Sequence, residues 1–427
     1  MKKAALLLFL SLLSLCLLAG CASGGSKKVT IRFATQSIDQ NSKVLPASLE
    51  QLKKDYPNMV LEVEESPGND LITKINTDIM GDNTPDIFTF WRPEAKWSVD
   101  KYIEMGALAD LSELKNDPEF KDLFADYAWR TATVDGKVWC IPRFSFFVEF
   151  LVNKTVFEAN GIPLPTDWSS LVNATSALKN AGVIPWAIDT KEGLDDSSRL
   201  FNAIINRRVG NAKGLELLQG IRSFTEPDVV AALDLFIELA ANNAPPDASS
   251  LDLNQVISKY LNTGKAGMVI GHAGQINPNL TDEAMADLIP LSFPLTPDAV
   301  ISAPSAEQDL TNLVYISAKA FADPEKKPIL VEFLHRLCGK AAGKDYVEIE
   351  RQMLPHLGLD IDQSKIVPLQ SAAMQIAESN PGDKWLLSYA KPGPVDEFRI
   401  VINQAWVGAY SSGTEMASAL DAALYQK

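Results

Sequence analysis

Histidine, cysteine and acidic residues are the side chains from which most active sites are built, and here they form no recognisable catalytic pattern. The three histidines are His272, His335 and His356, which are too dispersed in the sequence to indicate a metal site. The chain contains no HExxH, GxSxG or G-x-x-x-x-G-K-[ST] motif. Its many carboxylates leave a glycosidase pair open, but no spacing singles one out. We therefore expect no enzyme, no cofactor and no bound metal.

The four cysteines are Cys16, Cys21, Cys140 and Cys338. None of them forms a CxxC pair, which excludes a thioredoxin-like redox site and a zinc ribbon. Cys140 and Cys338 are far apart in the sequence and lie beside hydrophobic residues. The sequence leaves open whether they pair, and we favour two buried free thiols.

The first segment has the pattern of an export signal. Lys2 and Lys3 precede an apolar run, 4–18, that is too short to span a membrane comfortably. The sequence Leu-Ala-Gly-Cys that ends at Cys21 resembles the lipobox of bacterial lipoproteins, in which the cysteine carries diacylglycerol. We expect a signal peptide at 1–20 and a lipidated tether at 21–28, which would anchor the protein to the bacterial cell membrane. A plain signal peptide that contains a cysteine is the alternative.

The rest of the chain is predicted to alternate strands and helices. The segment 29–33 alternates apolar and polar residues, Met59, Leu61 and Val63 mark a second strand, and 85–91 is a short apolar run typical of an interior strand. Helical stripes separate these strands, formed by Leu45, Leu49 and Leu52 and by Leu71, Ile75 and Ile79. This order indicates βαβ units with helices on both faces of a largely parallel sheet.

A second α/β set is predicted after Pro142, which is followed by a cluster of phenylalanines. Asp135-Gly136 predicts the turn of a hairpin just before it. The last hundred residues are predicted to be mostly helical. The elements predicted in the second set are helices around 168–178 and 233–240 and strands at 183–188 and 266–270.

Five segments, in this order, resemble one known family. They are Gly-Asp-Asn-Thr-Pro-Asp-Ile at 81–87, Asp-Gly-Lys-Val-Trp-Cys-Ile-Pro at 135–142, Val-Asn-Lys-Thr-Val-Phe-Glu-Ala-Asn-Gly-Ile at 152–162, Pro-Thr-Asp-Trp at 165–168, and Gly-Lys-Ala-Gly-Met-Val-Ile-Gly at 264–271. Together they resemble the extracellular solute-binding proteins, family 1, which are sugar-binding lipoproteins of ABC importers related to maltodextrin-binding protein. The resemblance covers nearly all of the mature chain.

The resemblance implies an α/β, two-lobed periplasmic-binding-protein fold of type II. Each lobe would be a mostly parallel sheet flanked by helices, and the ligand would bind in the cleft at the hinge. It places the first lobe at 29–143 plus 310–345, and the second at 144–309 plus 346–427. Closure of the lobes on the ligand would produce the form that docks on the permease.

A sugar presents apolar C–H faces and a rim of hydroxyl groups, so its site needs flat aromatic surfaces and planar polar side chains. In open α/β sheets, ligands lie beyond the carboxyl ends of the strands. This rule, the expected hinge and the loop near 308 give the candidate ligand-binding residues, which are Gln36, Ser37, Asp39, Trp91, Arg92, Phe144, Phe146, Trp186, Asp189, His272, Gln275, Gln308 and Asp309.

These candidates differ in strength. Trp91 is the strongest, because the family often has an aromatic residue after this strand and Arg92 adds a guanidinium beside it; the alternative is a core tryptophan. For Trp186 a position in the hydrophobic core is at least as plausible as one in the binding site. The phenylalanines are expected to serve mainly in core and hinge packing. His272 stands where the family commonly has Gly-Pro-Trp, which argues against a maltodextrin-type stacking wall on that side.

The length, composition and charge of the chain limit the number of lobes and the classes of ligand. The 427 residues are 46% hydrophobic, which suits two or three folded lobes, and the net charge of −15 disfavours nucleic-acid binding. We expect a monomeric, lipid-anchored extracytoplasmic protein that binds a mono- or oligosaccharide. It would deliver this ligand to ABC permease subunits with a cytoplasmic ATPase. A lipoprotein glycosidase and a ligand-sensing subunit of the same fold are the alternatives.

Overall fold

The computed structural model describes residues 27–36, 42–66, 68–90, 99–191, 196–303, 306–379, 382–383, 386–389 and 394–425. The signal peptide, Cys21, Ser37, Asp39, Trp91 and Arg92 therefore lie outside the described residues. Two large hydrophobic cores form within them. One combines residues from 29–141 with residues from 310–338, and the other combines 146–293 with 386–424. The predicted two-lobed α/β architecture is confirmed.

The first lobe is built on a four-stranded sheet in the order β11-β3-β1-β2. β1 lies parallel to β2 and β3, whereas β11 pairs with β3 in the antiparallel sense. The alternation of the β1 sequence buries Ile31 and Phe33, and both predicted helical stripes enter the core. Its elements are β1 (Val29–Gln36), α2 (Val44–Asp55), β2 (Met59–Ser66), α3 (Gly68–Met80), β3 (Ile87–Phe90), η2 (Ser112–Asn116), α5 (Asp126–Ala132), β4 (Thr133–Val134), β5 (Lys137–Val138), β11 (Leu313–Ile316), α14 (Ala318–Ala322), α15 (Lys327–Cys338) and α16 (Lys340–Glu350).

The second lobe contains a six-stranded sheet with the path β12-β10-β6-β8-β7, and β9 also pairs with β6. β7 and β8 are parallel, as are β10 and β12, whereas β6 is antiparallel to each of its neighbours. This sheet is mixed because the strand that enters the lobe, β6, runs against its partners. Its elements are β6 (Phe144–Asn153), α6 (Lys154–Ala159), α7 (Trp168–Asn180), β7 (Ile184–Trp186), α8 (Ser198–Val209), α9 (Asn211–Leu218), α10 (Pro227–Ala240), η3 (Ala248–Ser250), α11 (Leu253–Val256), η4 (Ile257–Leu261), β8 (Ala266–His272), α12 (Ala273–Ile276), η5 (Asn277–Asn279), α13 (Asp282–Asp287), β9 (Leu288–Leu291) and β10 (Ala306–Thr311), followed near the C-terminus by η6 (Gln363–Lys365), α17 (Pro368–Ser379), β12 (Gly382–Asp383), η7 (Leu386–Tyr389), α18 (Pro394–Trp406) and α19 (Gly413–Tyr425).

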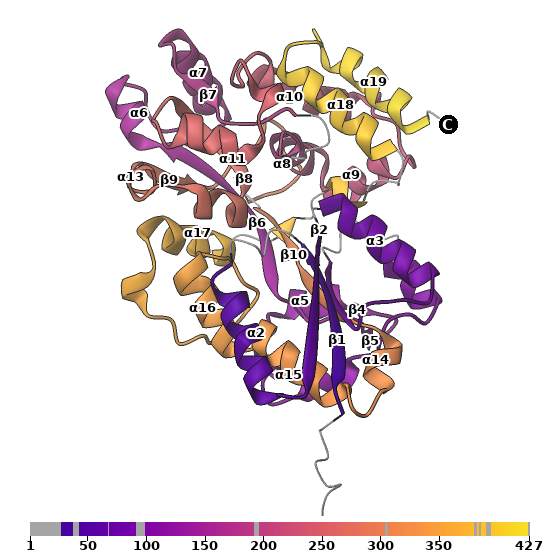
Figure 1. The fold of residues 1–427 in the computed structure, drawn as a ribbon. Coiled ribbons are helices and arrows are strands. Elements are labelled where there is room, and N and C mark those ends of the chain that lie inside the picture. Colours follow the sequence, from indigo (N-terminus) through magenta and orange to yellow (C-terminus); the bar gives the residue numbers. More distant parts are fainter. Residues whose placement is uncertain are drawn as a thin grey trace, which may run out of the picture.

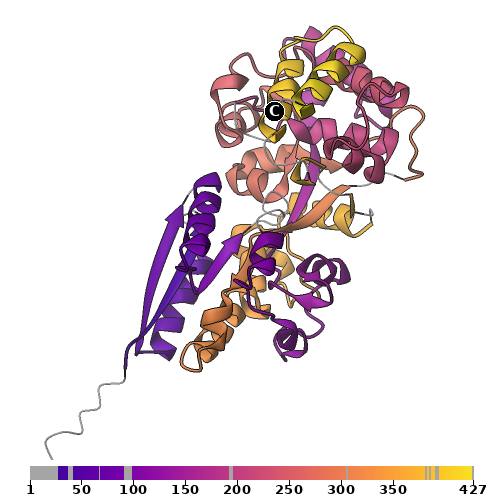
Figure 2. The ribbon, with the colours of Figure 1, turned by 90° about the vertical axis from the view of Figure 1, so that its right-hand side faces the viewer.

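Each lobe is built from segments that lie far apart in the sequence. Figure 1 shows the indigo strands β1 and β2 in the lower lobe together with the orange helix α15, which packs against α2. The yellow helices α18 and α19 lie beside α10 in the upper lobe. The side view in Figure 2 shows the two lobes joined in the middle of the molecule.

Two antiparallel strands carry the chain between the lobes. The first residues of β6 pair with β10, with Phe144 opposite Thr311 and Phe147 opposite Gln308. The segment after α16 adds a third connection, because the Ser145 N–H donates to the Met353 carbonyl at 2.9 Å. All ten residues of β6 are buried, which explains why its sequence lacks the alternation of a half-exposed strand.

The exact bounds of the lobes stay a prediction, and the packing of the C-terminal helices bears on the last one. α16 contacts α2 and α15 of the first lobe. α17 is the next helix, and its Leu369 joins the core residues Leu151 and Leu253 of the second lobe. These contacts favour a final return to the second lobe near α17, later than residue 346.

Two further sequence predictions can be compared with the fold. Cys140 and Cys338 are both buried, and they are free thiols in the structure. Among the described helices, none is long and apolar enough to cross a lipid bilayer.

Candidate functional site

A cleft of about 580 Å³ lies where the two lobes meet the strands that join them. The first lobe contributes the end of β1 and the start of α2. The second lobe contributes α11, α12, η5 and the end of β8, and the hinge contributes its base. The lining residues are Gln36, Ser42, Lys43, Phe144, Asn254, His272, Gly274, Gln275, Pro278, Asn279, Thr311, Asn312 and residues 349–352.

The cleft wall that the first lobe contributes is held in place by the carboxylate of Glu350, which caps the N-terminus of α2. One carboxylate oxygen of Glu350, Oε1, accepts hydrogen bonds from the Ser42 hydroxyl at 2.7 Å, the Lys43 N–H at 2.8 Å and the Val44 N–H at 2.9 Å. The Ser42 hydroxyl in turn accepts from the Leu45 N–H. The end of α16 therefore holds the beginning of α2 in place at the cleft.

Phe144 lies at the base of the cleft and is oriented by a buried cation. The Arg143 guanidinium lies over the Phe144 ring at 4.4 Å and donates to the Tyr346 hydroxyl at 2.8 Å. The rings of Phe144 and Tyr346 meet edge to face with centroids 4.9 Å apart. These contacts hold an aromatic surface where β6 leaves the first lobe.

The wall of the second lobe includes His272, which ends β8. Its imidazole stacks on the ring of Phe146, and the Arg199 guanidinium lies 4.7 Å from the centroid of that ring. Burial lowers the pKa of His272 to about 3, and the charge of Arg199 contributes to the shift. The imidazole is therefore neutral at physiological pH. The Arg199 charge is offset by Glu307, 3.9 Å away.

Two buried polar atoms of lining residues have no hydrogen-bond partner among the described residues, and they are Nε2 of His272 and Oδ1 of Asn312. Asn312 has φ of 50°, a left-handed conformation that asparagine tolerates better than most residues, where β10 passes into β11. Buried polar atoms are nearly always hydrogen-bonded in native proteins, so this position suits a hydroxyl donor from a ligand or water.

The predicted residues fall into three groups. Gln36, Phe144, His272 and Gln275 lie together around the cleft. Phe146 lies beneath His272 as its stacking partner. The remaining described candidates do not line this cleft, and they are Trp186, Asp189, Gln308 and Asp309.

The structure gives these remaining candidates other surroundings. Trp186 is 1% exposed and packs against Phe150 in the core of the second lobe, which is the alternative weighed for it above. Asp189 is also buried there. Gln308 and Asp309 lie within β10, where a loop was expected, and pair with Phe147 and Phe146 of β6.

Several lining residues were missed in the sequence. Asn254 and Asn279 lie in short helical segments that show no strong periodicity. Asn312 and residues 349–352 lie close to the two later hinge crossings, which the family resemblance had placed near 310 and 345. An inspection of the polar residues beside those crossings would have found them.

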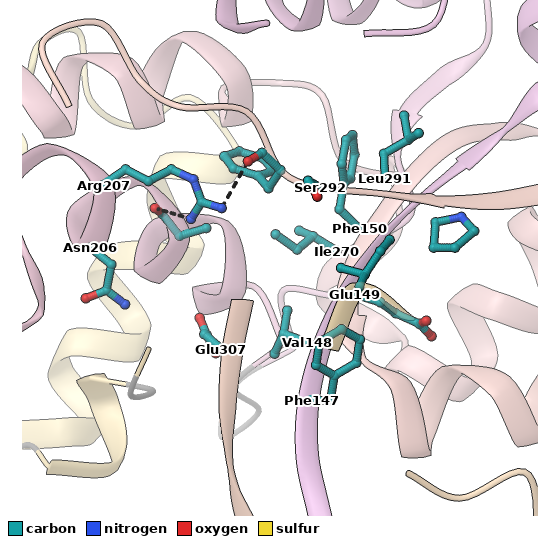
Figure 3. A pocket seen from close by; sticks show the side chains of 14 residues that line it. Phe147, Val148, Glu149, Phe150, Asn206, Arg207, Ile270, Leu291, Ser292 and Glu307 are labelled. Carbon is teal, nitrogen blue, oxygen red and sulfur yellow. Dashed lines mark hydrogen bonds between the residues drawn. The ribbon is translucent and has the colours of Figure 1, made fainter. Parts of the chain in front are cut away.

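A second, much smaller cavity lies inside the second lobe (Figure 3). Its volume is about 30 Å³, and it borders β6 between Phe147, which pairs with β10, and Phe150, which pairs with β9. Arg207 closes one side by donating to the carbonyls of Ala203 and Phe293, each at 3.0 Å. A water molecule occupies about 30 Å³ in the liquid, so this cavity is too small for a sugar.

Comparisons with known proteins agree with this architecture. Residues 37–323 match a family described as bacterial extracellular solute-binding protein. The ABC transporter periplasmic-binding protein YcjN of Escherichia coli (strain K12) is 25% identical over 283 residues. That match spans 63% of this chain and 61% of YcjN, which is less than two thirds of its length.

Two solved structures have the same fold. A chitin oligosaccharide binding protein superposes with a TM-score of 0.80 at 16% identity, and the match covers 92% of this chain and 98% of that one. The ABC substrate-binding protein Lmo0181 from Listeria monocytogenes, in complex with cycloalternan, gives a TM-score of 0.70 at 17% identity over 93% and 98% of the two chains. The family match and the shared type II fold confirm the resemblance inferred from the five segments. The chain belongs to the bacterial extracellular solute-binding proteins, family 1.

Proposed function

We propose that this protein is the solute receptor of an ABC importer and that it binds a saccharide in the cleft between its lobes. The lipid-anchored protein would hold the ligand outside the cytoplasm and deliver it to the permease subunits, which a cytoplasmic ATPase drives. It would act by binding alone, as a monomer, without catalysis.

The composition of the cleft is the observation that carries this proposal. Its lining includes six neutral amide side chains, each of which can donate and accept hydrogen bonds. A ring of sugar hydroxyls needs this combination, and Phe144 adds an aromatic surface for a C–H face. The volume of about 580 Å³ falls within the usual range for small-molecule sites. The amide residues are Gln36, Asn254, Gln275, Asn279, Asn312 and Gln352.

The similar proteins support the same class of ligand. The two solved structures described above carry names that refer to chitin oligosaccharide and to cycloalternan, both of which are carbohydrates. The predicted signal peptide and Cys21 support an extracytoplasmic position and a lipid anchor. Ser37, Asp39, Trp91 and Arg92 stay candidates for the part of the site that the described residues do not include.

A thermal-shift screen of the mature protein tests the proposal. A ligand that binds only the folded state raises the unfolding temperature, and the rise grows with the ratio of the free ligand concentration to the dissociation constant. We expect at least one mono- or oligosaccharide to raise it, while polyols and glycerol phosphodiesters leave it unchanged. Recovery of the saccharide intact after long incubation would support a receptor. A cleaved saccharide, or a complete lack of response to carbohydrates, would contradict the proposal.

A further inference from the structure

We propose that Glu350 is a specificity-determining residue that excludes anionic ligands from the cleft and so selects for neutral saccharides. This inference rests on the proposed function of the cleft. It concerns the class of saccharide, and it follows from the way in which Glu350 occupies the N-terminus of α2.

The N-terminus of α2 faces the cleft through Ser42 and Lys43. The N-terminus of a helix carries a partial positive charge and unpaired backbone N–H groups, so it attracts carboxylates and phosphates. The first turn of α2 consists of Val44, Leu45, Pro46 and Ala47. The helix therefore does not supply its own acid to neutralise this end.

Glu350 supplies that acid from a distant part of the chain. A single carboxylate oxygen of Glu350 accepts hydrogen bonds from the Lys43 N–H, the Val44 N–H and the Ser42 hydroxyl, with donor–acceptor distances of 2.7–2.9 Å. Glu350 itself lines the cleft. The donors that would bind the carboxylate or sulfate group of a ligand are thus already bound to a carboxylate of the protein.

The other charged residues of the lining fit this conclusion. Arg351 turns its guanidinium to Asp282 of α13, with an N–O distance of 3.2 Å, and so has its own counter-ion. Lys43 is exposed, and among the described residues its ammonium group forms no ion pair; the Glu350 carboxylate is bonded to its backbone N–H. Without Glu350, the helix end and Lys43 together would form an anion site in the cleft.

Titration with inorganic sulfate tests this inference without knowledge of the sugar. Glu350→Ala uncovers the helix end, and Glu350→Gln keeps an acceptor oxygen but removes the charge. Glu158→Gln is a matched control, because Glu158 is an exposed acid on α6 that lies away from the cleft. Sulfate also stabilises proteins without binding a specific site, so all variants are compared at constant ionic strength.

We expect sulfate to raise the unfolding temperature of Glu350→Ala more than that of the wild-type protein or Glu158→Gln, whose common rise measures the non-specific effect. Glu350→Gln should fall between them. Glucuronate and galacturonate should behave like sulfate, with binding at least about fivefold tighter to Glu350→Ala than to wild type.

Two outcomes would overturn the inference. One is a wild-type protein that binds sulfate or the uronates as tightly as Glu350→Ala does. The other is a Glu350→Ala variant that has native circular dichroism but no gain in anion binding, with Glu350→Gln equally unresponsive. Neither outcome depends on the response to neutral saccharides, so failure of the proposed function remains a separate result.

Discussion

The imidazole of His272 lies flat against the ring of Phe146, with ring centroids 4.6 Å apart and planes inclined by 9°. Arg199 lies over the same phenylalanine, and its positive charge disfavours protonation of the histidine. Burial has the larger effect in lowering the pKa of His272 to about 3. The second-lobe wall of the cleft therefore carries a neutral aromatic pair, although one of its members is a histidine.

Ligand affinity should consequently not depend on the titration of His272. Its ordinary pKa is 6.5, and the lowered value keeps the side chain neutral throughout the range from pH 5 to pH 8. We expect the dissociation constant, measured by isothermal titration calorimetry, to stay constant across that range. A change in affinity centred near pH 6.5 that disappears in His272→Gln would show that the imidazole titrates normally.

Glu149 should make the free energy of unfolding fall as the pH rises, which is the opposite of the effect of an ordinary surface acid. Its carboxylate is buried beside Asn277, and in Figure 3 it projects to the other side of β6 from Arg207. Burial raises the pKa of Glu149 to about 8, with Asn277 opposing the shift. The folded state thus holds a proton that the unfolded state releases near pH 4.5. The stability that Glu149 contributes is complete below pH 4.5 and is lost as the pH rises toward 8.

Glu149→Gln should remove this loss. We expect the variant to match wild type near pH 4.5 and to exceed it at pH 8 by several kcal/mol, on the order of 1.4 kcal/mol for each unit of pKa shift. Urea unfolding of both proteins at the two pH values measures the difference, and Glu158→Gln serves as an exposed control. If the difference in unfolding free energy between Glu149→Gln and wild type were the same at both pH values, Glu149 would be ionised in the folded protein.

The fold was largely predictable because its patterns are local. The alternation in β1 and the stripes Leu45, Leu49, Leu52 and Leu71, Ile75, Ile79 correspond to real elements, and Asp135-Gly136 forms the expected hairpin turn between β4 and β5. β6 was not identified as a strand of ten residues. It is buried on both faces, so its sequence is mostly apolar and aromatic, with Ser145, Glu149 and Asn153 as its polar residues, and it lacks the period of two of a half-exposed strand.

The site was less predictable, because its geometry depends on contacts between distant segments. Gln36 and His272 end strands, and the rule about strand ends selected both. Glu350 reaches Ser42 across 308 positions of sequence, and no local pattern announces that contact. The rule about strand ends also selected Trp186, but the side chain of Trp186 packs into the core of the second lobe. The sequence could not predict the direction in which this side chain points.

Cys21 should decide whether the protein is attached to the membrane. If the lipobox is used, the thiol of Cys21 carries the lipid and holds the mature chain at the membrane. Cys21→Ala should move the protein from the membrane fraction to the soluble fraction while saccharide affinity stays unchanged. Cys140→Ala is a suitable control, since that thiol is buried in the first lobe. Membrane attachment that survives in Cys21→Ala would contradict a lipid anchor at this residue.

The two tryptophans selected from the sequence should respond oppositely to truncation. Trp186 is buried against Phe150, so Trp186→Ala should cost about 3–5 kcal/mol of unfolding free energy, as large core truncations do. Trp91→Ala should instead weaken saccharide binding at least about tenfold, a loss of about 1.4 kcal/mol, and leave the unfolding temperature of the unliganded protein almost unchanged. Calorimetric titration and thermal unfolding of both variants separate the two effects. A large loss of unliganded stability in Trp91→Ala would assign Trp91 to the core, and the aromatic contribution to the cleft would then rest on Phe144 and the His272–Phe146 pair.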